Sequence, residues 1–293
     1  RNPIRRTSIT NLAAKYENNR LTVIANAYAT LSQDKVKETE KSKYKRLSPS
    51  LSLSYALFDS KKLRVRASYR DVFRMPTISE EYYKQVGVEL KPEKIKQYNI
   101  GAVWSSTISN RIEYLRVVVD AYRANVRDKI IIKTSTGLSQ TSNRGEVSMT
   151  GIDVNTNMTF RLNENLKLDV AGGYSYLKAI DVTSESDKNY KDQIIYTPLH
   201  SGSGSVVLDN PWLNFGYSFV ASGERYFLPQ NTKSNRMDAY SDHTVSVNKQ
   251  FKIKNIQLSA QADVRNLFGE NYSIINGYPM PGRSFTVSLN LKF

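Results

Sequence analysis

The last twelve residues of the chain, Gly282–Phe293, alternate strictly between apolar and polar side chains. Apolar residues occupy every second position from Phe285 to Phe293, with Ser, Thr, Asn or Lys between them. A period of 2 predicts a β-strand with one apolar and one polar face. A strand that crosses a bilayer at a tilt needs about 9–11 residues, and aromatic residues mark its two ends. The stretch fits a membrane strand and a soluble sheet equally well, so the rest of the chain must decide between them.

Twelve further segments repeat this alternation, most of them over about ten residues, which is the length of a membrane strand. With the closing stretch they make thirteen predicted strands, which are Arg1–Glu17, Leu21–Gln33, Leu47–Phe58, Lys62–Arg70, Lys94–Trp104, Ile112–Asn125, Val147–Leu162, Leu166–Leu177, Gln193–Leu208, Trp212–Ala221, His243–Ile253, Ile256–Phe268 and Gly282–Phe293.

The connections between these strands alternate between short and long. Asp59–Lys61 and Asn163–Asn165 are short turns, whereas Phe73–Pro92, Val126–Gly145 and Ser222–Asp238 are long. Outer-membrane barrels combine short periplasmic turns with long extracellular loops in this way. A soluble β-sandwich has no reason to sort its loops by length. The sequence therefore predicts an all-β, antiparallel transmembrane β-barrel, with Asp34–Lys45 as one charged loop.

The strand count itself raises a question, because single-chain bacterial barrels normally have an even number of strands. Either Lys129–Thr134 supplies a fourteenth strand, or the chain is part of a larger barrel. If the short turns are periplasmic, the direction of the strands places Arg1 at an extracellular end. That direction favours a missing N-terminal portion.

Composition limits the partners and the chemistry that this chain can have. The formal net charge of +15 would suit a nucleic-acid partner, but the Lys and Arg residues are scattered through strands and loops without a basic helix. We expect no nucleic-acid partner. The absence of Cys excludes disulfides and thiolate chemistry. Arg1–Thr10 has no apolar core, so we expect a mature or truncated chain rather than one with a signal peptide.

Three stretches are more specific than the alternation. They are FRMPTISEEYY (Phe73–Tyr83) followed by VELKPEKIKQYNIG (Val88–Gly101), NRGEVSMTGIDVN (Asn143–Asn155), and the closing VRNLFGENYSIINGYPMPGRSFTVSLNLKF (Val264–Phe293). In their order and spacing they resemble TonB-dependent outer-membrane receptors, and the resemblance covers most of Tyr55–Phe293. It is specific to the family and not to a ligand.

The resemblance implies a barrel of roughly 22 strands with a plugged lumen. It also implies active uptake of a scarce ligand such as an iron-siderophore, cobalamin or haem, energised by the TonB complex. On this hypothesis residues 1–293 are the C-terminal part of the barrel in the bacterial outer membrane, without the plug domain and the first strands. Its partners are then outer-membrane lipid, the barrel-insertion machinery, the small-molecule ligand, and TonB through the absent N-terminal part.

The alternative functions are a passive fourteen-stranded pore, which needs Lys129–Thr134 as a membrane strand, and a membrane enzyme. No catalytic, metal-binding or cofactor-binding constellation supports the enzyme, so we expect no catalysis, no metal and no cofactor. His200 and His243 are expected on the barrel wall or surface, and Asp181, Asp187 and Asp192 as solvated loop charges, because their spacing does not match a calcium loop.

Phe73, Arg74 and Pro76 match the family's F-R-x-P element, which either contacts the ligand or only orders its loop. Haem receptors of the family carry a nearby His that is missing here, so haem ligation at this loop is not supported. Aromatic and cationic side chains at the outer strand ends are ligand-binding candidates, and a membrane-interface girdle is the competing interpretation. These candidates are Arg74, Tyr82, Tyr83, Arg225, Tyr226, Phe227, Arg236, Tyr272 and Tyr278.

Two further sets of side chains have an expected place in the barrel. Arg64, Arg66 and Arg70 share one strand face, which we expect to line the lumen, either opposite plug carboxylates or as a solvated wall. In the closing strand, Phe285, Leu289, Leu291 and Phe293 resemble the signal that the barrel-insertion machinery reads.

Overall fold

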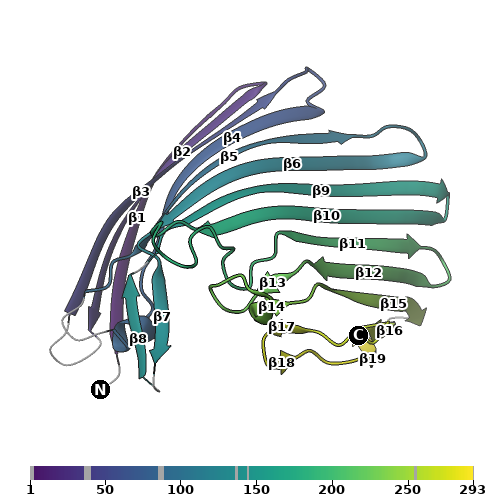
Figure 1. Ribbon diagram of the computed structural model, residues 1–293. Coiled ribbons are helices and arrows are strands. Elements are labelled where there is room, and N and C mark those ends of the chain that lie inside the picture. The colour runs from purple at the N-terminus through teal and green to yellow at the C-terminus, as the bar shows by residue number, and fades with distance from the viewer. Residues whose placement is uncertain are drawn as a thin grey trace. The chain divides into compact units, whose positions relative to one another are not determined.

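The computed structural model describes residues 3–35, 41–84, 89–135, 138–143, 145–253 and 256–292. Strands dominate it, and thirteen of them form one antiparallel sheet in which chain neighbours pair (Figure 1). The thirteen predicted strands are thereby confirmed. In order across the sheet they are β1 (Ile4–Glu17), β2 (Leu21–Lys35), β3 (Lys41–Ala56), β4 (Leu63–Arg74), β5 (Glu93–Ser106), β6 (Ile112–Arg127), β9 (Val147–Asn163), β10 (Leu166–Asp181), β11 (His200–Asp209), β12 (Asn214–Ser222), β15 (Tyr240–Ile253), β16 (Ile256–Arg265) and β19 (Ser284–Lys292).

The long connections carry small elements of their own. Three two-stranded hairpins are β7 (Ile130–Ser135) with β8 (Leu138–Asn143), β13 (Arg225–Tyr226) with β14 (Arg236–Met237), and β17 (Ser273–Ile275) with β18 (Tyr278–Pro279). The helices are α1 (Ile78–Tyr82) and the 3-10 turn η1 (Lys233–Asn235). Among the described residues, no helix is both long and apolar enough to span a membrane.

The hairpin β7–β8 decides the question of a fourteenth strand. The candidate Lys129–Thr134 is indeed extended as β7, but it pairs with β8 and not with the thirteen-stranded sheet. One edge of β7 is therefore paired within the connection between β6 and β9. The fourteen-stranded alternative required this segment in the wall, and that requirement is contradicted.

The chain divides into two compact units. The first comprises Arg1–Gly101, Ala121–Gly151 and Lys178–Asp192. Its strand register continues one apolar face across the sheet, because Leu51 pairs with Ala25 on one side and with Tyr69 on the other. On the opposite face Arg66 pairs with Ser54, and Arg64 donates to the Ser54 hydroxyl over 3.1 Å. The three arginines of β4 thus share the polar face, as their alternation predicts.

The second unit comprises Ala102–Asp120, Ile152–Leu177 and Gln193–Phe293. Here one apolar row crosses six strands. The row begins at Phe285 and ends at Val170, and each member pairs with the next in the order Phe285, Val264, Val245, Tyr217, Val206 and Val170.

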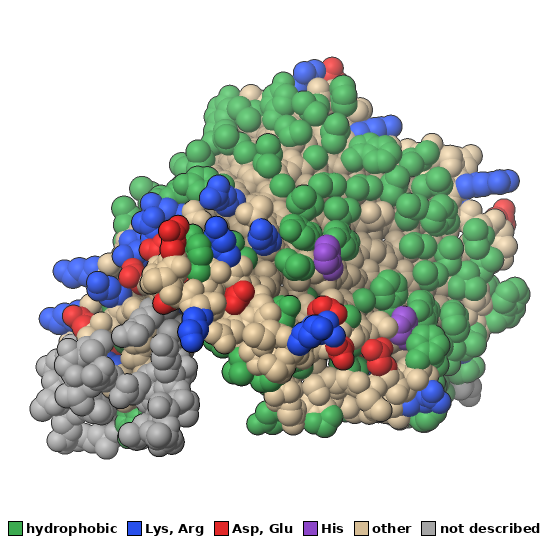
Figure 2. All heavy atoms as spheres, viewed as in Figure 1, with side chains coloured by type: hydrophobic (Ala, Val, Ile, Leu, Met, Phe, Trp, Pro, Cys, Tyr) green, Lys and Arg blue, Asp and Glu red, His purple; other side chains and the backbone are tan. Residues whose placement is uncertain are grey.

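The apolar face is exposed in both units, so the fold is not built around it as a core. Val287 is 75% exposed and Leu12 76% exposed, although both lie in apolar rows. Hydrophobic side chains cover much of the strand surface seen in Figure 2. In the first unit the buried apolar residues instead gather at strand ends and in the long connections, as Leu90, Val126 and Ile130 do. A face of this size needs an apolar environment outside the chain.

Among the predicted boundaries that were wrong, three have a clear physical cause. In the expected loop Asp34–Lys45, residues 34–35 and 41–45 are strand, because backbone pairing continues past the apolar rows into charged residues, with Lys43 opposite Gln33, and residues 36–40 lie outside the described part of the chain. The strand expected from Gln193 begins at His200, because Pro198 has no amide donor and Tyr196 has a left-handed φ of 54°. The strand expected to reach Phe268 ends at Arg265, because Asn266 has a φ of 48°.

Candidate functional site in the long connections

Arg74, at the end of β4, is held by two carboxylates. Its Nε and Nη2 donate to the Oε2 and Oε1 atoms of Glu93 over 2.8 and 2.7 Å. Its Nη1 and Nη2 donate to the Oε2 and Oε1 atoms of Glu80 over 3.0 and 3.1 Å. Such fork-to-fork pairs are the strongest geometry available to a guanidinium. Arg74 therefore joins β4 to α1 and to the start of β5.

Glu93 and Asn143 also hydrogen-bond to backbone groups of neighbouring segments. Glu93 Oε1 also accepts the amide of Ile130 over 2.8 Å, which connects β5 to the hairpin β7–β8. Asn143 in β8 donates to the carbonyls of Lys91 and Asp128, each over 2.7 Å. The connection between β4 and β5 is thus fastened to the connection between β6 and β9.

The start of helix α1 is fixed by its first residues. Thr77 and Glu80 form a reciprocal capping box, in which each side chain accepts the other residue's amide. Glu81 is 1% exposed, yet it accepts from the Tyr44 hydroxyl and lies 3.1 Å from the Lys84 ammonium. Arg5 pairs with Asp34 and donates to the Pro76 carbonyl over 2.6 Å.

Tyr82 and Tyr83 end this helix with their rings in the open. They are 54% and 49% exposed, and their rings meet edge to face with centroids 5.2 Å apart. The helix and its cap present two aromatic surfaces, whereas the F-R-x-P residues are less exposed. Phe73 is half-buried and Pro76 is buried.

Acidification is expected to loosen α1. Burial raises the pKa of Glu80, but hydrogen bonds from Arg74 and from Thr77 outweigh it, so the pKa lies below the ordinary 4.5. A lowered carboxyl pKa stabilises the fold above 4.5, and this stability is lost as the pH falls through the lowered pKa. Hydrogen exchange of residues 77–84, corrected for intrinsic rates, should therefore speed up below pH 4.5. Equal protection of these amides on both sides of that pH would contradict this role, and Glu80→Gln is the control that should remove most of the dependence.

Arg225 organises the connections of the second unit. Its side chain is buried, with the residue 3% exposed. Its Nη1 donates to the Asp238 carbonyl over 3.1 Å, its Nη2 donates to the Ser273 carbonyl, and its guanidinium carbon lies 4.9 Å from the Tyr240 ring centroid. The residue holds the β12–β15 connection against the β16–β19 connection.

The Tyr240 ring also contacts Tyr272. Tyr272 stacks on Tyr240 with centroids 4.3 Å apart, and its hydroxyl donates to Asp242 over 2.6 Å. Burial, followed by the hydrogen bond to Asp242, raises the pKa of Tyr272, so the phenol keeps its proton over the physiological range. Tyr272 thus contributes a fixed donor and a fixed ring rather than a mobile contact.

Asn266 is the residue that turns the chain out of β16. It is 3% exposed and left-handed, its Nδ2 donates to the carbonyls of Glu270 and Pro281 over 2.8 and 3.3 Å, and its Oδ1 accepts the Glu270 amide over 2.8 Å. Glu270 in turn accepts the Ser241 amide over 3.0 Å. We did not single out Asn266 from the sequence. Its signal is an Asn before Leu-Phe-Gly at the end of an alternating strand, a residue type that tolerates positive φ.

The remaining ligand candidates lie nearer the surface. Tyr226 pairs with Arg236 in the hairpin β13–β14. The Arg236 side chain is 41% exposed and lies 3.2 Å from Glu224 and 3.4 Å from Asp238. Phe227 is half-buried, and Tyr278 is 72% exposed at the hairpin β17–β18. The structure thus groups the nine candidates into two clusters, one in each unit.

The two histidines lie on the sheet and not in these clusters. Each ring Nδ1 is 2.7 Å from a tyrosine hydroxyl, Tyr174 for His200 and Tyr217 for His243. His243 pairs in register with Phe219, which places it on the apolar face. Asp181 accepts from Thr183 and Asn189. Within the described part of the chain, no group of three or more His, Cys, Asp or Glu residues is arranged to hold a metal ion.

Comparison with known proteins adds to this geometry. Residues 9–267 match the family model described as "TonB dependent receptor-like, beta-barrel". A search of curated proteins found no match. Similar solved structures include BauA, the ferric preacinetobactin receptor of Acinetobacter baumannii, with a TM-score of 0.75 and 16% identity over 99% of this chain. Fiu, the ferric-catecholate import receptor of E. coli K12, has a TM-score of 0.71 at 16% identity over 99%, and the copper transporter OprC has 0.73 at 16% over 97%.

At such identities the likeness to the solved structures is one of fold. The chain spans 43% of the length of BauA, 45% of Fiu and 47% of OprC. It therefore corresponds to less than half of each of these proteins.

Proposed function

This chain belongs to the TonB-dependent receptor family, as the match over residues 9–267 shows, and we propose that it forms part of an outer-membrane barrel that imports a scarce ligand. The ligand classes are an iron-siderophore, cobalamin or haem, and uptake draws on the TonB complex. The observation that carries the proposal is the exposed apolar face of the thirteen-stranded sheet, which a bilayer would cover.

We further propose that residues 1–293 make up the C-terminal portion of a larger barrel, with the plug domain and first strands outside this chain. The support is the likeness of Val264–Phe293 to the closing segment of the family, together with the chain's share of BauA. TonB would then act through the N-terminal part of the whole protein. The polar face with Arg64, Arg66 and Arg70 would line the lumen.

The residues of the two loop clusters differ in exposure, which suggests two different roles at the extracellular rim. Arg74, Arg225 and Tyr272 are engaged within the fold, so we propose that they hold the rim in shape. Tyr82, Tyr83, Tyr278 and Arg236 keep exposed surface, and we propose that they contact the ligand, with Tyr226 and Phe227 supporting them. Exposed rings and a guanidinium suit a flat or anionic ligand.

A transport assay tests the proposed function. Cells that lack the full-length protein are compared with cells that produce it, with and without TonB, for uptake of labelled ferric siderophores, cobalamin and haem. The proposal expects one ligand class to be taken up only when both the protein and TonB are present. Uptake that persists without TonB, together with ion conductance of the purified protein in bilayers, would instead support a passive pore.

The closing strand is expected to direct assembly. Phe285, Leu289 and Leu291 lie on its exposed apolar face, whereas Phe293 is outside the described residues. If the barrel-insertion machinery reads this strand, Phe293→Ala should lower the amount of protein in the outer membrane more than it lowers the ligand affinity of the protein that does assemble. Immunoblots of outer-membrane fractions measure the first quantity, and normal membrane levels of the variant would refute the assignment.

A further inference from the structure

Cations lie on both faces of the sheet at one end of strands β1, β2 and β3. The two faces differ in whether carboxylates pair with these cations. On one face each is paired, Arg5 with Asp34 and Arg46 with Asp71 over 2.7 Å. On the other face Arg6, Lys43 and Lys45 are exposed, and within the described residues no carboxylate pairs with them. We call these three residues the outer basic patch.

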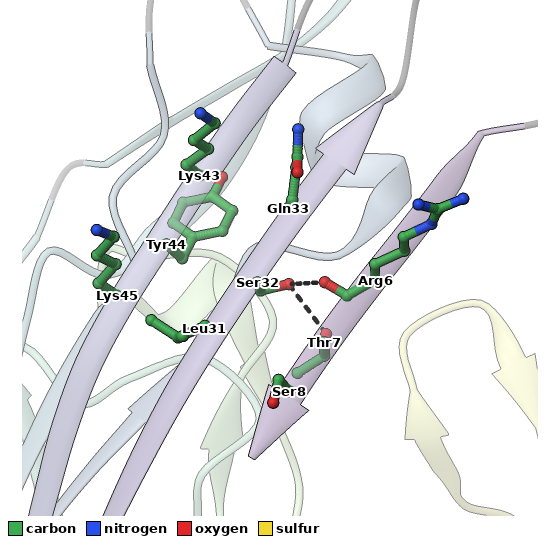
Figure 3. A pocket seen from close by; sticks show the side chains of 9 residues that line it. All are labelled: Arg6, Thr7, Ser8, Leu31, Ser32, Gln33, Lys43, Tyr44 and Lys45. Atoms are coloured by element: carbon green, nitrogen blue, oxygen red, sulfur yellow. Dashed lines mark hydrogen bonds between the residues drawn. The ribbon is translucent and has the colours of Figure 1, made fainter. Parts of the chain in front are cut away.

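The register brings the patch together. Gln33 of β2 pairs with Arg6 of β1 on one side and with Lys43 of β3 on the other. Leu31 likewise pairs with Lys45, which places the three cations around the end of β2. Together with Leu31 and Ser32 they line a groove of about 430 Å³ (Figure 3). Neighbouring strands lie about 4.8 Å apart, so the charges are close enough to act on one anionic surface.

The patch lies directly beyond the apolar rows on the same face. Leu31 and Leu47 are 53% and 61% exposed, and in register Leu47 follows Lys45 down β3 opposite Ala29. A lysine beside an apolar band can bury the aliphatic part of its side chain against lipid while its ammonium group reaches the headgroups. Short and long connections alternate along the chain. The patch therefore lies at the strand ends that the long connections join.

We propose that the outer basic patch binds the phosphate groups of lipid headgroups in the outer leaflet. The inference rests on the proposed function, because it needs the apolar face in a bilayer and the long connections outside. Charge complementarity selects the occupant, since none of the described carboxylates pairs with the three positive charges of the patch, which faces the same way as the apolar rows. Each Lys or Arg near an anionic membrane surface contributes affinity that falls with added salt.

The test uses the full-length protein, purified from membranes and placed in phosphatidylcholine nanodiscs with graded amounts of lipid A, a phosphorylated lipid. Native mass spectrometry of the released protein counts the lipid A molecules retained. Lys43→Gln with Lys45→Gln is expected to weaken apparent lipid A affinity about 10- to 30-fold, from two lost surface charges. The matched control is Lys62→Gln with Lys252→Gln, two exposed lysines near short turns, and it should stay within about twofold of the unmodified protein.

The outcomes separate the inference from its premise. Equal retention by the two double variants would overturn the inference, as would equal retention of dephosphorylated lipid A. Displacement of lipid A by inorganic phosphate at matched phosphate concentration would show a free-anion site instead of a lipid surface. A protein that stays soluble without detergent and does not enter nanodiscs would reject the proposed function and the inference with it. Loss of lipid A retention with normal ligand uptake is the expected pattern.

Discussion

Replacing Asn266 with alanine is expected to loosen residues 266–283, the connection between β16 and β19, because the Asn266 side chain holds this connection in its folded form. Three hydrogen bonds of a buried side chain are lost, which costs about 3 kcal/mol, and a left-handed alanine costs about 1 kcal/mol more. A total of about 4 kcal/mol corresponds to roughly a thousandfold faster amide exchange through local opening. Hydrogen–deuterium exchange of peptides from 266 to 283 measures it.

Asn266→Gly is the matched control, because glycine accepts the φ of 48° without strain and removes only the side-chain bonds. It should exchange less rapidly than the alanine variant, by about the factor of 5 to 10 that 1 kcal/mol supplies. Unchanged exchange in the alanine variant would show that this side chain does not hold the connection.

Replacing Arg225 with alanine is expected to uncouple the β12–β15 connection from the β16–β19 connection. The carbonyls of Asp238 and Ser273 lose their donor, and Tyr240 loses its cation. Charged hydrogen bonds contribute about 1.5–3 kcal/mol each, so the loss is about 3 kcal/mol or more. Limited proteolysis should then cut the exposed segment 228–230 on the order of a hundredfold faster.

Arg236→Ala is the control for this experiment, because Arg236 is a near neighbour whose exposed ion pairs contribute roughly 0–1 kcal/mol. It should leave the cleavage rate almost unchanged while it weakens ligand binding, whereas the Arg225 variant should lose both. Equal cleavage rates for the two variants would contradict the distinction between a residue that holds the rim and one that contacts the ligand.

The wall of this fold could be predicted because its signal is local. A period of 2 marks each strand regardless of what lies beside it, and the closing strand from Ser284 to Lys292 needed nothing else. The pattern fails where charge replaces apolar residues without ending the pairing. Lys43 looks like a loop residue in the sequence, yet its backbone continues the ladder opposite Gln33.

The candidate site could be predicted only in part, because its geometry depends on distant partners. Arg74 was identifiable from its motif, but Glu93 stands 19 residues away and only the fold brings it to the guanidinium. Arg225 donates a hydrogen bond to a carbonyl that lies 48 residues further along the chain. A cation in a loop sequence looks the same whether it faces a ligand or a buried carbonyl, so the sequence could not separate the residues that hold the rim from the exposed ones.

Cysteine labelling in intact cells tests whether the thirteen-stranded sheet lies in the outer membrane with its apolar face in lipid, because residues 1–293 contain no Cys. Three single variants of the full-length protein, with any Cys outside residues 1–293 replaced by Ser, place one thiol each in a long connection (Gln230→Cys), in a short turn (Asp59→Cys) and on the apolar face (Val287→Cys). A membrane-impermeant maleimide should label the first in intact cells and the second only after the outer membrane is opened. It should label the third in neither case, although Val287 is 75% exposed in the chain alone. Labelling of Asp59→Cys in intact cells, or of Val287→Cys as readily as Gln230→Cys, would contradict the account.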